Sequence, residues 1–220
     1  MDDTAIYLRN AAAMWSSLGP SVSYEGPLFR AVFPGFTRLI ALAPAGPVEP
    51  PDGAYTFEDA FGPPADGLER LPVMVRPPGP VDPVQPRPGV TVGEVRDAAE
   101  LVVAERVMVD GFPLPRFQPL HPGRALPARV LSLPGWRVWL AYRDGEPAAG
   151  AYTFDDGTST GVYWVVTLPG HRGQGLAGTL LSAAISPNQP HSLVATHAGR
   201  PLYEKLGFAV TGHVNWHSRD

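Results

Sequence analysis

The spacing of apolar residues changes several times along this 220-residue chain, and each spacing predicts one kind of element. Helical spacing over residues 4–18 predicts an amphipathic helix. Short apolar runs at 28–33 and 39–42 are typical of strands. We therefore expect residues 1–76 to form a small α/β unit.

A proline-rich segment follows this unit. Six prolines lie between Pro77 and Pro88, and neither a helix nor a central strand tolerates that density. We expect a semi-rigid linker over residues 77–90 and a second domain over residues 91–220.

The pattern after the linker predicts a second α/β unit. Thr91 and Glu94 form a capping-box pattern, so a helix is expected from there to about Val109. Asp-Gly turns and apolar alternation then predict three antiparallel strands. The later elements are a helix from Gly175 that Pro187 stops, and a short helix between two strands. The predicted strands are 137–142, 148–154, 160–167, 192–195 and 208–216, and the short helix is 201–206.

The composition of the chain excludes several kinds of functional site. With 44% hydrophobic and 17% charged residues the chain should fold, and without cysteine it has no disulfide, thiolate zinc site or catalytic thiol. A net charge of −4 argues against nucleic-acid binding. Asp2 and Asp3 open the chain where a signal peptide would be basic, and no apolar run is long enough to span a membrane. We expect a cytoplasmic protein that does not bind membranes.

A glycine-rich turn from Leu168 to Gly178 lies between an apolar strand and an amphipathic helix. The first N–H groups of that helix lack intrahelical acceptors, and the positive end of the helix dipole favours an anion. Arg172 adds a positive charge beside them. The turn therefore predicts a phosphate site.

Two other kinds of nucleotide site share part of this glycine pattern. Residues 173–178 also read as G-x-G-x-x-G, but a dinucleotide fold needs an acidic residue at the end of the next strand, and 194–197 contain none. Only 42 residues follow Gly178, too few to complete that sheet. A nicotinamide dehydrogenase is therefore disfavoured. A Walker A loop is excluded because no Lys-Ser or Lys-Thr follows the glycines.

Two motifs in the right order resemble one family. Arg172–Ala177 matches the pattern (Q/R)-x-x-G-x-(G/A), and Leu202–Phe208 is similar to L-Y-x-x-L-G-F. Thr167-Leu168-Pro169 stands where the family usually has V-x-P. On these residues, the region from about 90 to 217 resembles the Gcn5-related N-acetyltransferase (GNAT) superfamily. The linker and first unit also resemble a bacterial subgroup in which a degenerate acetyltransferase-like half precedes the active one.

The resemblance implies a fold and an activity. The fold would be α/β (α+β), a mixed, mainly antiparallel sheet flanked by helices, and the co-substrate would be acetyl-CoA. The acetyl group would pass directly to a primary amine of a small-molecule or peptide acceptor. Tyr203 falls on the family's general-acid position. The implied cofactor-binding residues are Val165, Val166, Thr167, Arg172, Gly173, Gln174, Gly175, Leu176, Ala177, Gly178 and Thr179.

One departure supports an alternative function. Thr196 stands where many family members have an asparagine, and Asp155-Asp156-Gly157 reads as an ordinary turn, so no general base is named. The alternative is a non-catalytic acyl-CoA-binding sensor. No metal site is expected, because His213 and His217 are four residues apart on a predicted strand, where that spacing spans about 13 Å.

Overall fold

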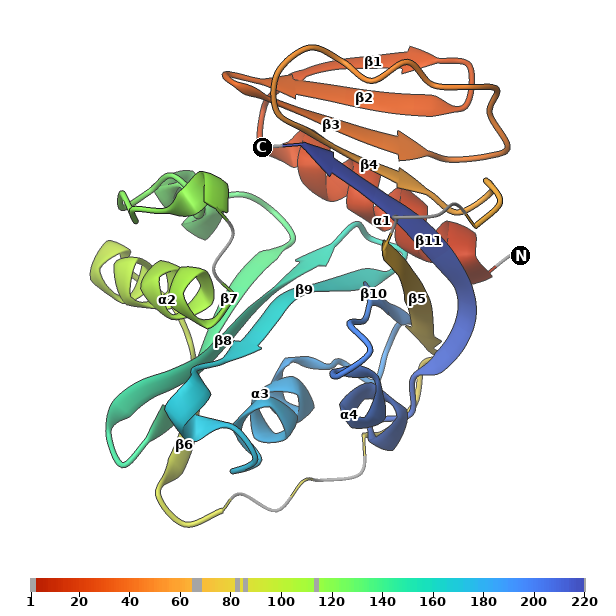
Figure 1. Ribbon diagram of the computed structural model, residues 1–220. Coiled ribbons are helices and arrows are strands. Elements are labelled where there is room, and N and C mark those ends of the chain that lie inside the picture. The colour runs from red at the N-terminus through yellow and green to blue at the C-terminus, as the bar shows by residue number, and fades with distance from the viewer. Residues whose placement is uncertain (1–2, 65–68, 82–83, 85–86, 113–114, 220) are drawn as a thin grey trace. The chain divides into compact units, whose positions relative to one another are not determined.

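The computed structural model describes residues 3–64, 69–81, 84, 87–112 and 115–219. These residues adopt a mixed α/β fold whose strands pair mainly antiparallel and are flanked by helices, so the expected fold class is confirmed (Figure 1). They divide into two compact units, Met1–Pro77 with Ser192–Asp220, and Pro78–His191. We call these the N-terminal unit and the central unit.

The N-terminal unit is a sheet covered on one face by a helix. Its strands follow the order β1-β2-β3-β4-β11-β5-β10, and α1 packs on β5, β11 and β3. The only parallel pair with a described register in this unit is β3 with β4. Its elements are α1 (Asp3–Ser17), β1 (Ser21–Glu25), β2 (Leu28–Phe33), β3 (Phe36–Ala41), β4 (Tyr55–Asp59), β5 (Glu69–Arg76), β10 (His191–Val194), α4 (Arg200–Lys205) and β11 (Ala209–Arg219).

A buried ion pair joins α1 to this sheet. Arg38 on β3 pairs with Glu58 on β4, and the Tyr7 hydroxyl of α1 donates to Glu58 at 2.7 Å. The Arg38 guanidinium also lies 5.0 Å from the Trp15 ring centroid and 4.8 Å from that of Trp216. Glu58 therefore points towards α1. Since side chains alternate along a strand, the neighbouring β4 positions point to the opposite face.

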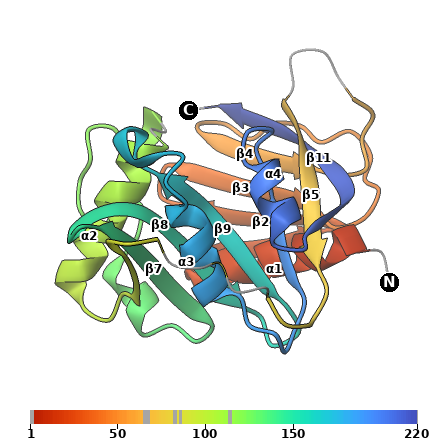
Figure 2. The same ribbon diagram turned by 90° about the horizontal axis from the view of Figure 1, so that it is seen from below.

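The central unit contains an antiparallel sheet in the order β9-β8-β7-β6, flanked by two helices (Figures 1 and 2). Helix α2 packs on β8 and β9, and α3 packs on β7 and β8. Seven successive residues of β8 are buried, as expected of an inner strand. Its elements are β6 (Val90–Glu94), α2 (Ala98–Gly111), β7 (Trp136–Arg143), β8 (Glu146–Asp155), β9 (Thr160–Thr167) and α3 (Leu176–Ala184), with short 3-10 helices at Pro115–Phe117, Ala128–Leu131 and Pro169–His171.

The helix expected to start at Thr91 begins later. Residues 90–94 form β6, paired with β7, and α2 begins at Ala98. Its N-cap is Asp97, whose carboxylate accepts the N–H of Glu100 at 2.9 Å, while the Glu100 carboxylate accepts the N–H of Arg96. The prediction of the helix start at Thr91 was wrong because a second acidic capping pattern lies six residues downstream of the first.

The C-terminal residues belong to a different compact unit from the one that the sequence predicts. β11 pairs with β4 on one edge and β5 on the other, so residues 192–220 belong to the N-terminal unit. Residues 91–220 therefore do not form one compact unit. The predicted domains 1–76 and 91–220, joined by a linker at 77–90, stay a prediction. Within the predicted linker, residues 82, 83, 85 and 86 lie outside the described residues.

Candidate functional site

A β-bulge interrupts β9 next to the predicted pantetheine-binding residues. Tyr163 pairs with Tyr152 and Val166 with Gly150, so Trp164 and Val165 together oppose one residue of β8. Such a bulge leaves the extra residue outside the regular ladder. Val165 therefore lies outside the regular β8 register, whereas Val166 and Thr167 stay in register with β8.

Trp164 carries the strain of this bulge. Its φ is 50°, in the left-handed region that a bulky residue adopts at a cost of about 1–2 kcal/mol. Its indole N–H is buried and has no hydrogen-bond partner among the described residues. Nothing in the sequence signalled this strain, because the apolar run over 160–167 reads as a regular strand.

Glycine makes the turn after β9 possible. Gly173 and Gly175 have φ values of 74° and 81°, which side chains disfavour. Gly175 is the N-cap of α3, so the glycine-rich turn leads directly into the first turn of the helix. The sequence correctly predicted this strand, turn and helix.

The predicted phosphate-binding amides differ in whether they already donate a hydrogen bond within the protein. The N–H groups of Leu176, Ala177 and Gly178 begin α3 and lack an intrahelical acceptor four residues earlier. Thr179 differs, because both its N–H and its hydroxyl donate to the Gly175 carbonyl, at 3.0 and 3.2 Å. The N–H of Arg172 is also engaged, weakly, with the Pro169 carbonyl at 3.4 Å.

Arg172 braces the turn. Its guanidinium donates to the Thr167 carbonyl at 3.2 Å and, less closely, to the Gly111 carbonyl at 3.4 Å. The side chain thus ties the turn to the end of β9 and to the C-terminus of α2. Gln174 adds a bond from its side-chain amide to the Gly170 carbonyl at 3.2 Å. Arg172 therefore has a structural task besides the charge that the sequence suggested.

A second arginine, Arg87, lies against the turn. A Cβ added at Gly175 would lie 3.1 Å from Arg87 Nε and 3.7 Å from Cζ, so the guanidinium covers the N-cap of α3. Arg87 is exposed and forms no ion pair among the described residues. A cation beside the positive end of a helix is unfavourable unless an anion joins them. The sequence gives no sign of this contact, because Arg87 belongs to the predicted linker, 88 residues before Gly175.

Tyr203 belongs to α4 in the N-terminal unit. The residue is 7% exposed, and its ring packs edge to face on Phe208 with centroids 6.0 Å apart. Burial raises the pKa of Tyr203 above its ordinary value near 10, so the phenol keeps its proton at neutral pH. The structure thus gives Tyr203 both the packing contact and the protonation state of an acid.

Two other residues of the N-terminal unit have informative surroundings. Thr196 closes the turn before α4, since its hydroxyl oxygen accepts the N–H of Gly199 at 3.1 Å. His213 on β11 is half-buried, and burial, assisted by Arg70, Arg200 and His197, lowers its pKa. A neutral imidazole can accept a proton, and the sequence analysis had considered His213 only as a metal ligand.

The carboxylates of the acidic turn form local hydrogen bonds with the backbone. Asp155 accepts the N–H of Gly157, and Asp156 accepts those of Thr158 and Ser159, as in an ordinary turn. Within the described residues, no three His, Asp or Glu side chains gather in a way that would hold a metal ion. None of the described helices is long and apolar enough to cross a membrane.

A family model matches part of the chain. Residues 134–210 match the family model described as acetyltransferase (GNAT) domain. This match covers β7, β8, β9, the glycine turn, α3, β10 and α4. No curated protein matched the chain.

Solved structures resemble a larger part of the chain. A GCN5-related N-acetyltransferase from Kribbella flavida is 21% identical, with 97% of this chain and 95% of that chain covered and a TM-score of 0.68. A GCN5-related N-acetyltransferase from Sphaerobacter thermophilus is 13% identical, with 89% and 77% covered and a TM-score of 0.61. At these identities the likeness shows a shared fold.

Proposed function

Since residues 134–210 match the family model of the acetyltransferase (GNAT) domain, we propose that this protein transfers the acetyl group of acetyl-CoA directly to a primary amine. The acceptor would be a small-molecule or peptide amine in the cytoplasm. Direct transfer needs no covalent enzyme intermediate, which suits a chain without cysteine.

The observation that carries this proposal is the anion cradle at the start of α3. Three helical N–H groups, the left-handed Gly175 and the guanidinium of Arg87 converge there. Together they fit the pyrophosphate of CoA, because N–H groups at a helix N-terminus and an arginine both favour phosphate oxygens. The pantetheine arm would bind along β9 at the bulge that contains Val165.

The reaction has simple requirements. The amine nitrogen, once deprotonated, attacks the thioester carbonyl carbon, the carbon–sulfur bond breaks, and the departing sulfur takes up a proton. We assign this proton to Tyr203, whose buried phenol stays protonated at neutral pH. Backbone N–H groups would stabilise the oxyanion that forms between the two steps.

The test uses Gly175→Val. Valine at a φ of 81° is strained, and its side chain would meet both Arg87 and any phosphate in the cradle. We expect the variant to fold and to bind CoA at least about 10-fold more weakly by calorimetry. Gly157→Val is the matched control, because its φ is 88° and nothing lies within 4 Å of its added Cβ.

Release of the CoA thiol with a panel of amines completes the test. Amine-dependent release by the wild type supports acetyl transfer. Saturable CoA binding without release for any amine would favour the non-catalytic sensor instead, a role consistent with the use of the Thr196 hydroxyl within the turn before α4. Equal CoA affinity of the folded Gly175→Val variant and the wild type would reject the cradle.

A further inference from the structure

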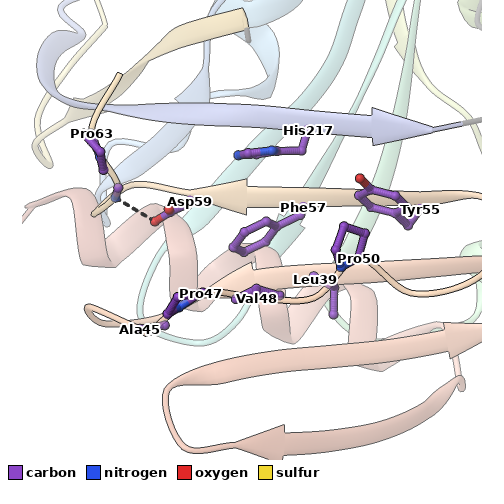
Figure 3. A pocket seen from close by; sticks show the side chains of 12 residues that line it. Leu39, Ala45, Pro47, Val48, Pro50, Tyr55, Phe57, Asp59, Pro63 and His217 are labelled. Carbon is purple, nitrogen blue, oxygen red and sulfur yellow. Dashed lines mark hydrogen bonds between the residues drawn. The ribbon is translucent and has the colours of Figure 1, made fainter. Parts of the chain in front are cut away.

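The N-terminal unit contains a cavity of about 340 Å³ (Figure 3). It lies on the face of β3, β4 and β11 that points away from α1, since Phe57 alternates with Glu58 along β4. A proline-rich loop that includes Val48 forms its outer wall. A cavity of this size holds a small organic molecule.

The floor of the cavity is a row of apolar and aromatic side chains. Phe57 on β4 pairs with His217 on β11 and with Leu39 on β3. The Phe57 and His217 rings lie 5.3 Å apart between centroids and are tilted by 32°. Tyr55 extends the row along β4, as Figure 3 shows. This floor offers aromatic faces to a ligand.

Polar contacts hold the rim of the cavity in place. The side-chain amide of Asn215 donates to the carbonyls of Gly62 and Pro63, at 3.1 and 3.0 Å. At the other end, Arg219 donates to the Gly53 carbonyl at 2.9 Å and lies over the Tyr55 ring, 5.1 Å from its centroid. The rim is therefore organised before any ligand binds, which lowers the entropic cost of binding.

Asp59 brings a negative charge into the cavity. One of its oxygens, Oδ1, accepts the N–H groups of Phe61 and Gly62, at 2.8 and 3.0 Å. No lysine, arginine or histidine of the described residues forms an ion pair with this half-buried carboxylate. An uncompensated carboxylate beside aromatic rings attracts a cation, because both the charge and the ring faces favour it.

We propose that this cavity binds a small ligand with an ammonium group on an aromatic or branched apolar body. The ammonium group pairs with Asp59, and the apolar body lies on Phe57 and His217. Binding at this site requires neither acetyl-CoA nor the glycine turn, so the proposal stands apart from the proposed acetyl transfer.

Calorimetry with benzylamine tests the proposal on the full chain without acetyl-CoA. We expect saturable 1:1 binding with a Kd of about 1 mM, a reasonable affinity for so small a molecule. Asp59→Asn removes the charge but keeps an oxygen for the two N–H groups of the turn, and should weaken binding at least about 10-fold. Glu49→Gln is the matched control, because Glu49 is exposed in the wall loop and does not line the cavity.

Two further measurements do not depend on the folding of the Asp59 variant. Benzyl alcohol, which has the same ring without the charge, should bind the wild type at least about 10-fold more weakly than benzylamine. Phe57→Leu should also weaken benzylamine binding, since it removes an aromatic face. The proposal is overturned if the wild type shows no saturable binding, if benzyl alcohol binds equally well, or if Glu49→Gln weakens binding as much as Asp59→Asn.

Discussion

Replacing Arg87 by methionine tests the cation that lies over the N-cap of α3. The change keeps an unbranched side chain and removes the charge, so we expect CoA to bind about 10-fold more weakly, the loss of one charge-assisted hydrogen bond. Calorimetry at two salt concentrations should also show a smaller salt dependence for the variant. Arg106→Met, an exposed arginine on α2, is the control. Equal affinities of the two variants for CoA would remove Arg87 from the cradle.

Tyr203→Phe separates packing from proton donation. Phenylalanine keeps the edge-to-face contact with Phe208 and lacks the hydroxyl, so fold and CoA affinity should persist while turnover falls about 10²-fold. Because burial raises the pKa of Tyr203, the wild type should not lose activity through this group as the pH rises to 10. Tyr24→Phe makes the same change at an exposed site. Parental turnover in Tyr203→Phe would assign the residue to packing.

Residues of the candidate site could be predicted where the chemistry is local in sequence. The left-handed glycines and the start of α3 belong to one continuous turn, so the sequence alone predicts them. Arg87 comes from a distant segment, so its position beside the turn could not be predicted. The hydrogen bonds from Thr179 to the Gly175 carbonyl are likewise seen only in the folded structure. The left-handed Trp164 could not be predicted either, because aromatic residues normally favour a regular strand.

Glu105 on α2 fixes the loop at residues 123–126. Its buried carboxylate on α2 accepts three backbone N–H groups of a loop, from Gly123 at 2.6 Å, Ala125 at 2.7 Å and Leu126 at 3.0 Å. Glu105→Gln replaces one oxygen by an amide that cannot accept these bonds. We expect the free energy of unfolding to fall by about 2 kcal/mol in urea titrations.

Arg106→Gln, one residue along the same helix but exposed, should change the unfolding free energy by less than about 0.5 kcal/mol. A Glu105→Gln variant as stable as this control would show that the loop does not depend on the carboxylate.

Elements were predictable where one spacing of apolar residues dominates. The strand, glycine turn and α3 satisfied both the pattern and the turn chemistry. At 90–100 two patterns compete, since Val90 and Val92 suit a strand while Thr91 and Glu94 imitate a helix start. Pairing of β6 with β7 decides between them, and the paired residues are 45 to 53 positions apart in the sequence.

At the scale of the whole molecule, a divided chain tests which residues form the N-terminal unit. Residues 1–77 and 78–220, produced together as two polypeptides, should form a 1:1 complex, because β11 on the second pairs with β4 and β5 on the first. Copurification through a tag on the first polypeptide measures this. Val214→Asp on β11 should abolish the complex, since Val214 is fully buried.

Val102→Asp on α2 is the control, because that side chain is 38% exposed. If residues 78–220 are soluble and monomeric while 1–77 fold alone, the predicted domain at 91–220 is self-contained and the compact units do not describe independent folding.

The position of β11 between β4 and β5 leaves these two strands incomplete in the nascent chain. A ribosome makes β4 and β5 more than 130 residues before β11, the strand that must lie between them. At a synthesis rate of about 5–20 residues per second, the edges of β4 and β5 that β11 later covers stay unpaired for several seconds or longer. During translation the two strands thus offer unpaired backbone to chaperones or to neighbouring nascent chains, whereas the central unit already has all its strands on the ribosome.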